Sequence, residues 1–371
     1  MYFDNAATSW PKPQEVINNV NQALQKAGNP GRGAHKAALW SAEVIFQARE
    51  EVAELFGIKN PLQIGFTENA TSALNFAIAQ LDGVIITTVM EHNSVLRPLF
   101  AKEEQPAIIP ADKNGDLDLD LFVWQIKKRK PKGVVMTHAS NVTGTVYDVE
   151  KIGAACKNQN VLFIVDASQT AGVVPICLDK IQADMLCFTG HKGLLGPQGT
   201  GGIAVRDGLD RILKPFKKGG SGSNSFLKAH PNAMPDAVEA GTLNTHGIAG
   251  LLAGVRYVKK YGIERIFQKE KELASLFRKR VSHIPGIQLY GNPNSPHVGI
   301  VSLNLPNIDS AECSQRLGES GIAVRGGSHC APGAHQALGT VDTGAVRFSF
   351  GVMNTKKEVE QAAAILHNMV L

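Results

Sequence analysis

The chain has 371 residues, 43% hydrophobic and 19% charged, a balance typical of a globular protein long enough for two domains. Its formal net charge of +5 comes from scattered Lys and Arg, and we interpret the one basic run, at 127–130, as a solvated helix end rather than a nucleic-acid patch. Five cysteines without a Cys-x-x-Cys pair argue against a disulfide framework or a zinc ribbon and favour a reducing compartment.

Buried strands and helices alternate through the first 250 residues. The segment 1–5 lacks signal-peptide features and no later apolar run has bilayer length, so we expect a cytoplasmic protein without membrane contact. Apolar spacing predicts a helix over 71–80. Continuous apolar runs, typical of parallel strands covered on both faces, predict strands at 84–89, 133–137, 161–165, 185–188 and 202–205. We therefore expect an α/β fold with a mostly parallel sheet.

The pattern changes after about residue 255. Strands are predicted at 299–303 and 345–350, and a last helix begins at Thr355, which forms a capping-box pattern with Glu358. We expect a large domain over 16–254, a smaller C-terminal α/β domain over 255–371, and an N-terminal segment, 1–15, packed with the small domain. The Gly/Ser stretch 218–224 is too short for a domain linker and is interpreted as a functional loop.

Polar side chains follow the predicted strands where ligands collect in a parallel sheet, at the carboxyl ends. Each has an ordinary alternative, such as a helix N-cap for Asp166 or a surface position for His92 and Lys192. Together they suit pyridoxal-5′-phosphate (PLP), which needs a lysine for covalent attachment, a carboxylate for the ring nitrogen and an aromatic face. The residues are His92, Asn141, Asp166, Gln169, Thr189, His191 and Lys192.

A phosphate site is predicted where the helix at 71–80 begins. The segment 67–72 offers the backbone N–H groups of a helix N-terminus, including that of Ala70, and the Thr71 hydroxyl, although an ordinary Ser/Thr cap is the alternative. The glycine-rich run 193–202 contains no Gly-Lys-Ser/Thr and is not a Walker motif. An early Gly-x-Gly-x-x-Gly is also missing, which argues against a Rossmann-type dehydrogenase.

Motifs in register over nearly the whole chain resemble those of class V aminotransferase-fold enzymes. They are Asp4-Asn5-Ala6-Ala7-Thr8, Glu91-His92, 140–145, 166–169, 189–192 and 239–244. Arg325-Gly326-Gly327-Ser328-His329-Cys330-Ala331 resembles the catalytic loop of the cysteine desulfurase and selenocysteine lyase branch. The resemblance implies a PLP-dependent transferase of aminotransferase fold type I. It also implies a homodimer acting on L-cysteine, with L-selenocysteine as the alternative, and a protein that accepts the sulfur.

Roles for individual residues follow from this resemblance. It implies that Lys192 is the covalent anchor and that His92 stacks on the ring. Asp166 would be the partner of the ring nitrogen, Gln169 the donor to the ring oxygen, and Asn141 an amide for substrate or cofactor. The phosphate ligands would be Ala70, Thr71, Thr189 and His191, with Thr242 supplied to the site of the other subunit. Arg347 would grip the substrate carboxylate, with Arg325 beside it, as suits a bidentate guanidinium.

Cys330 is the residue on which the assignment to the cysteine desulfurase branch depends. A lone cysteine is usually a small buried hydrophobe, but glycines at 326 and 327 and a proline at 332 indicate a loop here. Arg325 and His329 are expected to favour the thiolate that would attack the substrate sulfur. A zinc site through His329, Cys330 and His335 lacks a fourth ligand, so we expect no metal. The other four cysteines are interpreted as packing residues.

Three departures from the family pattern lie where substrate and sulfur acceptor would be handled. The segment 31–35 lacks the first His of His-Arg-Gly-x-His, Ser328 replaces a frequent His, and Gly333 replaces a bulkier residue. We expect a PLP-dependent cysteine desulfurase that leaves a persulfide on Cys330. A selenocysteine lyase, another class V lyase or aminotransferase, and a cofactor-binding scaffold without turnover are the alternatives.

Overall fold

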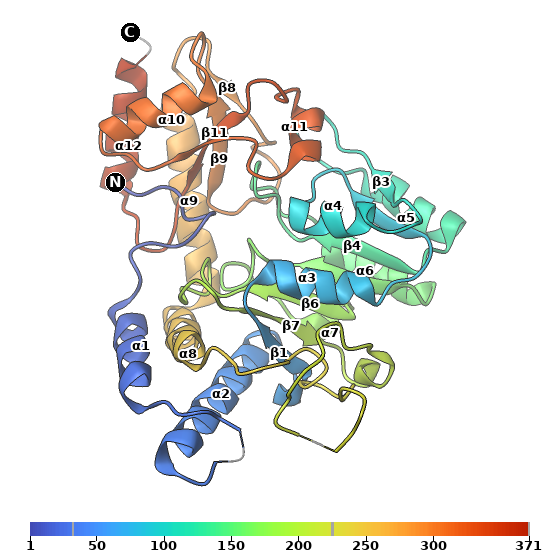
Figure 1. Cartoon of the computed structure of the whole chain (residues 1–371). Coiled ribbons are helices and arrows are strands. Elements are labelled where there is room, and N and C mark those ends of the chain that lie inside the picture. Colours follow the sequence, from blue (N-terminus) through green and yellow to red (C-terminus); the bar gives the residue numbers. More distant parts are fainter. Residues whose placement is uncertain (32, 224–225, 370–371) are drawn as a thin grey trace.

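The computed structural model describes residues 1–31, 33–223 and 226–369. Arg32 and Asn224, which belong to two of the segments discussed above, lie outside these ranges. Figure 1 shows a larger sheet with helices on both faces and a smaller sheet packed above it. In the part of the chain that the structure describes, no helix is long and apolar enough to cross a membrane.

The large sheet has seven strands in the order β1-β7-β6-β5-β4-β2-β3. Pairing is parallel from β6 through β3, whereas β7 is antiparallel to both of its neighbours. The mostly parallel sheet is thus confirmed, and the apolar pattern of β7 reflects burial on both faces rather than strand direction. The strands are β1 Ile64–Thr67, β2 Ile85–Thr88, β3 Ala107–Ile109, β4 Gly133–Thr137, β5 Leu162–Asp166, β6 Met185–Thr189 and β7 Gly201–Val205.

Each face of the large sheet packs against its own hydrophobic core. The strands therefore carry apolar side chains at successive positions. Along β4, Val134 and Met136 belong to one core and Val135 to the other. The predicted helix at 71–80 is confirmed as α3, and the basic run at 127–130 is the exposed end of α5. The helices of this part are α1 Gln14–Lys26, α2 Lys36–Leu55, α3 Ala70–Ala79, α4 Asn93–Phe100, α5 Leu119–Arg129, α6 Val149–Asn158, α7 Leu178–Ile181 and α8 Thr245–Tyr261, with 3-10 turns Pro61–Gln63 and Leu209–Ile212.

The small sheet is antiparallel in the order β10-β11-β9-β8. Its core includes Phe277, Leu303 and Phe348, and the predicted capping box of Thr355 and Glu358 begins the last helix. The strands are β8 Gln288–Leu289, β9 Ile300–Asn304, β10 Arg325–Gly327 and β11 Ala345–Ser349, and the helices are α9 Ile263–Val281, α10 Ser310–Glu319, α11 Pro332–Leu338 and α12 Lys356–Asn368.

The N-terminal residues extend this small sheet. Phe3 is buried in its core, its N–H donates to Ala323 O at 2.8 Å, and its carbonyl accepts from Ser349 N at 2.7 Å. Asp4 is therefore fixed opposite Ser349, where the two sheets meet. The boundary that we predicted after residue 254 falls inside α8, and the division into domains stays a prediction.

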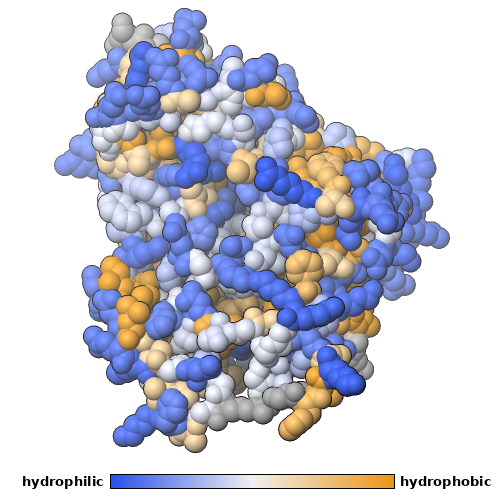
Figure 2. All heavy atoms as spheres, in the orientation of Figure 1, coloured by the Kyte–Doolittle hydropathy of each residue, from blue (hydrophilic) through white to orange (hydrophobic). Residues whose placement is uncertain are grey.

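The surface seen in Figure 2 is mostly hydrophilic. Hydrophobic atoms gather near α4 and β3, where Phe100 and Ile108 are exposed. They also gather at the lower edge, where the segment 214–243 lies, and this segment exposes Phe216 and Leu227. Within this segment, Met234, Ala237 and Val238 pack in the hydrophobic core on one face of the large sheet.

Candidate active site

One cavity of about 320 Å³ lies between the carboxyl ends of the parallel strands and the small sheet. Every residue that the sequence pointed to, except Thr242, lines this cavity. The predicted residues in it are Ala70, Thr71, His92, Asn141, Asp166, Gln169, Thr189, His191, Lys192, Arg325, Cys330 and Arg347. Ala6, Asn69, Ser94, Ser168 and His329 also line it, and we had not proposed them as ligands.

Lys192 and Asp166 come from neighbouring strands. Asp166 is the last residue of β5 and is 4% exposed, and Lys192 follows β6 in the adjoining turn. The backbone N–H of Ser168 and its hydroxyl both donate to Asp166 Oδ1, at 2.9 and 2.5 Å, which orients the carboxylate. Burial lowers the pKa of Lys192 from 10.5 to about 8, because a charged ammonium is poorly solvated there. The lysine can therefore react as a neutral amine near neutral pH.

His92 has a structural role as well as a place in the cavity. It is the N-cap of α4, and its Nδ1 accepts the backbone N–H of Ser94 at 3.0 Å. Burial lowers the pKa of His92, which favours the neutral ring. The Ser94 hydroxyl lies 2.7 Å from that of Thr71, which joins the beginnings of α3 and α4 along one wall of the cavity.

The beginning of α3 provides an anion site. Asn69 caps the helix through a 3.0 Å bond from Ser72 N, and first-turn N–H groups have no intrahelical acceptor. His191 also lines the cavity, and burial lowers its pKa to about 4, so that its imidazole is neutral. Its Nδ1 is buried and has no hydrogen-bond partner among the described residues. Such an atom indicates that a ligand group completes the site.

Two arginines of the small sheet line the cavity, and one carboxylate bonds to both of them. Arg325 of β10 and Arg347 of β11 are partners in the antiparallel register. Asp4 binds both, with Oδ2 at 2.9 Å from Arg325 Nη2 and Oδ1 at 3.2 Å from Arg347 Nη2. Arg347 Nη1 also donates to Asn141 O at 3.0 Å, while its buried Nε has no partner in the described ranges. Beyond its place in a motif, nothing had pointed to Asp4 as a site residue.

Cys330 is exposed in the cavity on a tight turn. His329 and Cys330 both have positive φ, of 52° and 56°, which is uncommon for side chains with a Cβ. The turn is held by its carbonyls, since Asn93 N donates to Cys330 O at 2.7 Å and Asn141 Nδ2 donates to His329 O at 2.8 Å. The Asn141 amide thus binds the cysteine loop, a role that we had not expected.

His329 does not supply the positive charge that we expected beside the thiol. Burial lowers the pKa of His329 to about 3, so the ring stays neutral. Its Nε2 lies 3.2 Å from Arg325 O, and its Nδ1 lies 3.4 Å from Nε2 of His335, whose Nδ1 is 2.7 Å from the Thr340 hydroxyl. The pair of imidazoles therefore braces the loop by hydrogen bonds. Arg325 and Arg347 are the cations that interact with Cys330.

The structure gives a packing reason for one departure from the family pattern. A Cβ added to Gly333 would lie 2.3 Å from Val89 O, so only glycine allows α11 to approach the end of β2. Cys156, Cys187 and Cys313 are buried, as predicted for packing residues, and Cys177 is half-buried. Across the described residues, no three His, Cys, Asp or Glu side chains are grouped so that they could hold a metal ion.

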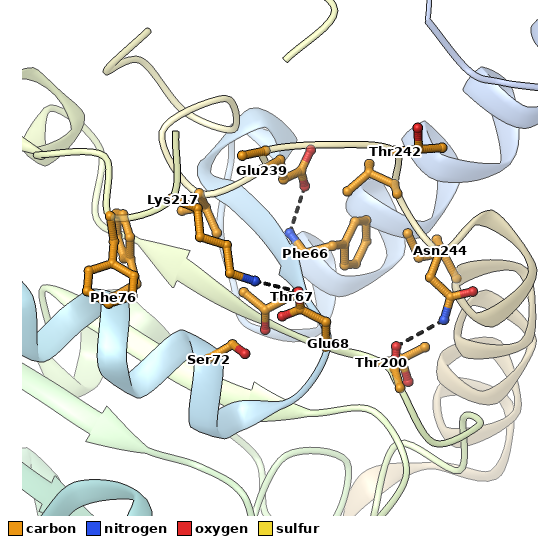
Figure 3. A pocket seen from close by; sticks show the side chains of 16 residues that line it. Phe66, Thr67, Glu68, Ser72, Phe76, Thr200, Lys217, Glu239, Thr242 and Asn244 are labelled. Atoms are coloured by element: carbon orange, nitrogen blue, oxygen red, sulfur yellow. Dashed lines mark hydrogen bonds and ion pairs between the residues drawn. The ribbon is translucent and has the colours of Figure 1, made fainter. Parts of the chain in front are cut away.

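Thr242 lies outside this cavity. It lines a separate pocket of about 140 Å³ together with Glu68, Lys217 and Asn244, shown in Figure 3. There Lys217 pairs with Glu68, and Asn244 Nδ2 donates to Gly199 O at 3.0 Å. Within one chain, the structure therefore does not bring Thr242 to the other predicted phosphate ligands.

Known proteins resemble this chain over its full length. The family described as aminotransferase class-V matches residues 1–362. A protein of Pyrococcus abyssi named "Probable cysteine desulfurase" is 34% identical over 385 residues, covering 100% of this chain and 94% of that protein. The apo structure of a cysteine desulfurase from Thermococcus onnurineus has a TM-score of 0.94 at 32% identity, covering 100% and 94% of the two chains. A cysteine desulfurase structure from Escherichia coli, with an S-sulfonic acid, has a TM-score of 0.87 at 27% identity, covering 100% and 95%.

Proposed function

Because the chain belongs to the class V aminotransferase family, we propose that it is a PLP-dependent cysteine desulfurase that converts L-cysteine to L-alanine and keeps the sulfur as a persulfide on Cys330. The observation that carries the proposal is the cavity in which Cys330, Lys192 and Arg347 face the same space. A cofactor-binding scaffold without turnover would have no need of all three.

The residues of the cavity fit PLP. The buried Nδ1 of His191, without a partner among the described residues, and the N-terminus of α3 with Thr71 are suited to the phosphate, together with Ala70 and Thr189. Asp166 would keep the ring nitrogen protonated, and Gln169 would donate to the ring oxygen. The neutral ring of His92 would stack on the cofactor, and Lys192 would anchor it covalently. Bound PLP would act as an electron sink for bonds at the substrate Cα.

Side chains of the protein would bind the substrate, transfer the proton and attack the sulfur. Arg347 would bind the substrate carboxylate through guanidinium donors that its contacts with Asp4 and Asn141 leave available. Lys192 would take the proton from Cα, since its lowered pKa of about 8 lets the amine accept and return a proton. The thiolate of Cys330 would then attack the substrate sulfur. A sulfur–sulfur bond forms as the carbon–sulfur bond breaks, so that L-cysteine and one thiol yield L-alanine and one persulfide.

A homodimer completes this proposal. Thr242 lies away from the cavity of its own chain and would serve the phosphate site of the other subunit. Phe216 and Leu227, exposed on the same segment, offer apolar surface for such an interface. The five cysteines, all free, suit a reducing cytoplasm, where a protein acceptor would collect the sulfur.

Replacing the thiol tests the function directly. Cys330→Ala should still bind L-cysteine, seen as a change in cofactor absorbance, because Lys192, Asp166 and Arg347 are untouched. Alanine production should fall by about 100-fold or more, as expected when a nucleophile is removed, and mass spectrometry should find no persulfide.

Cys177→Ala is the matched control, because Cys177 is a half-buried thiol outside the cavity. It should keep wild-type activity. Wild-type alanine production by Cys330→Ala would refute the assignment. Alanine formed from L-selenocysteine but not from L-cysteine in the wild-type protein would refute the proposed substrate.

A further inference from the structure

The carbonyl oxygen of His191 is surrounded by donors from the N-terminal segment. It accepts hydrogen bonds from Ser9 N at 3.0 Å and from Ser9 Oγ at 3.1 Å. The hydroxyl of Thr8 donates to it at 3.1 Å, and Lys12 Nζ donates to it at 3.0 Å. A carbonyl oxygen has two lone pairs, so four donors are more than it needs. This oxygen belongs to the peptide bond that joins His191 to the proposed anchor, Lys192.

Lys12 is the charged donor among the four. Its side chain is half-buried, and burial lowers its pKa from 10.5 to about 8, so that it stays mostly charged at pH 7. It also donates to Ser9 Oγ at 2.7 Å, but no carboxylate of the described residues forms an ion pair with it. Removing an ammonium from water without a counter-ion is unfavourable. Its bond to the carbonyl of His191 offsets this cost, because hydrogen bonds from charged donors are stronger than those from neutral ones.

The segment that carries these donors is itself attached to the small sheet. Phe3 is buried in the core of that sheet, and Ala6 N donates to Ser349 Oγ at 2.9 Å. Figure 1 shows this segment running from the small sheet to α1. The strand β6 ends at Thr189, and Lys192 lies beyond it in a turn. Contacts from outside the large sheet therefore help to determine where the amine of Lys192 lies.

We propose that Lys12 is a positioning residue: its ammonium holds the peptide that precedes Lys192, so that the amine of Lys192 is directed at the aldehyde carbon of PLP. The inference rests on the proposed function, in which Lys192 anchors the cofactor. In that step the neutral amine adds to the aldehyde, a carbon–nitrogen double bond forms, and one water molecule leaves. A misplacement of about 1 Å can slow such a step by about 100-fold.

The rate at which the apoprotein captures PLP tests this role. Stopped-flow absorbance at pH 7 should be recorded over a range of PLP concentrations for the wild-type protein, Lys12→Met and Lys12→Arg. We expect the limiting rate at saturating PLP to fall roughly tenfold in Lys12→Met. The half-saturating PLP concentration should change by less than about twofold, because no proposed phosphate ligand is replaced. Lys12→Arg, which keeps a charged donor, should recover most of the rate.

Lys102→Met is the matched control, because Lys102 is also half-buried and donates to a backbone carbonyl, Leu81 O, at 2.5 Å away from the cavity. It should capture PLP at the wild-type rate. Ser9→Ala, which removes another donor to the same carbonyl, should also slow capture and provides a second variant if Lys12→Met does not fold.

Three results would overturn the inference. The first is a wild-type limiting rate in Lys12→Met. The second is a smaller amount of captured PLP at an unchanged rate, which a role in folding alone would produce. The third is an equal slowing in Lys102→Met. Wild-type apoprotein that forms no covalent bond with PLP would instead overturn the proposed function.

Discussion

At the scale of single residues, the sequence identified candidate site residues but not their pKa values, which depend on burial. Lys192 was predicted from its place after a strand and from a motif, but its lowered pKa depends on the packing around it. His329 was predicted as a cation, and burial makes it neutral. Asp4 was not predicted as a site residue, because its two arginine partners lie 321 and 343 positions away in the chain.

The pKa of Lys192 predicts how the apoprotein captures PLP. Only the neutral amine reacts, and burial lowers this pKa from 10.5 to about 8. The capture rate should therefore rise with pH up to about 8 and then become constant, as stopped-flow absorbance can measure. Lys192→Ala should show no covalent attachment. A rate that keeps rising up to pH 10 would indicate an ordinary exposed lysine.

At the scale of elements, predictions succeeded where burial alone defines a strand. The central strands β4, β5 and β6 are apolar up to their last residues, Thr137, Asp166 and Thr189, because both faces are covered. The strands β1 and β3 were not predicted; β3 has only three residues, and Ile108 within it is exposed. Strand direction was not predictable either, since the antiparallel strand β7 is as apolar as the parallel strands β4, β5 and β6. The cavity residues followed from topology, because parallel strands end at one edge.

Two helical glycines should respond oppositely to the same change. A Cβ on Gly153 in α6 would lie 1.9 Å from Ile181 O, whereas no atom lies within 4 Å of one on Gly318 in α10. Gly153→Ala should lower the free energy of unfolding by about 1–3 kcal/mol through overpacking. Gly318→Ala should raise it by about 0.5–1 kcal/mol through helix propensity. Urea unfolding measures both, and effects of equal sign would contradict the packing of α6 on the segment at Ile181.

At the scale of the whole molecule, a buried ion pair joins Glu239, which comes after the large sheet in the chain, to α2 near the N-terminus. Arg49 of α2 binds Glu239 through two bonds of 2.7 and 2.5 Å, and Glu239 also accepts Phe66 N at 2.7 Å. Glu239→Gln leaves the Arg49 charge buried, which should cost roughly 3 kcal/mol of unfolding free energy. Hydrogen exchange should then accelerate around Thr242. Glu312→Gln, in an exposed pair with Arg316, should change stability by less than about 1 kcal/mol.

The homodimer can be tested by complementation. Light scattering should give twice the chain mass of 39.7 kDa. Lys192→Ala should be inactive, and Thr242→Ala should bind PLP more weakly. After the two variants are mixed and exchange subunits, the Thr242→Ala chain would receive Thr242 of the partner subunit, and activity should exceed the average of the separate variants. A mixture with only the average activity would show that each chain forms its site alone.

The tethered turn of Cys330 determines how the product must travel. The carbonyl of Cys330 accepts a hydrogen bond from Asn93 N, and the carbonyl of His329 accepts one from Asn141 Nδ2. These bonds hold the backbone of the turn, so the cysteine is not carried on a long mobile arm. The sulfur therefore stays at the wall of the cavity until another molecule collects it. On the proposed function, an acceptor would have to reach into the cavity to take the sulfur from Cys330.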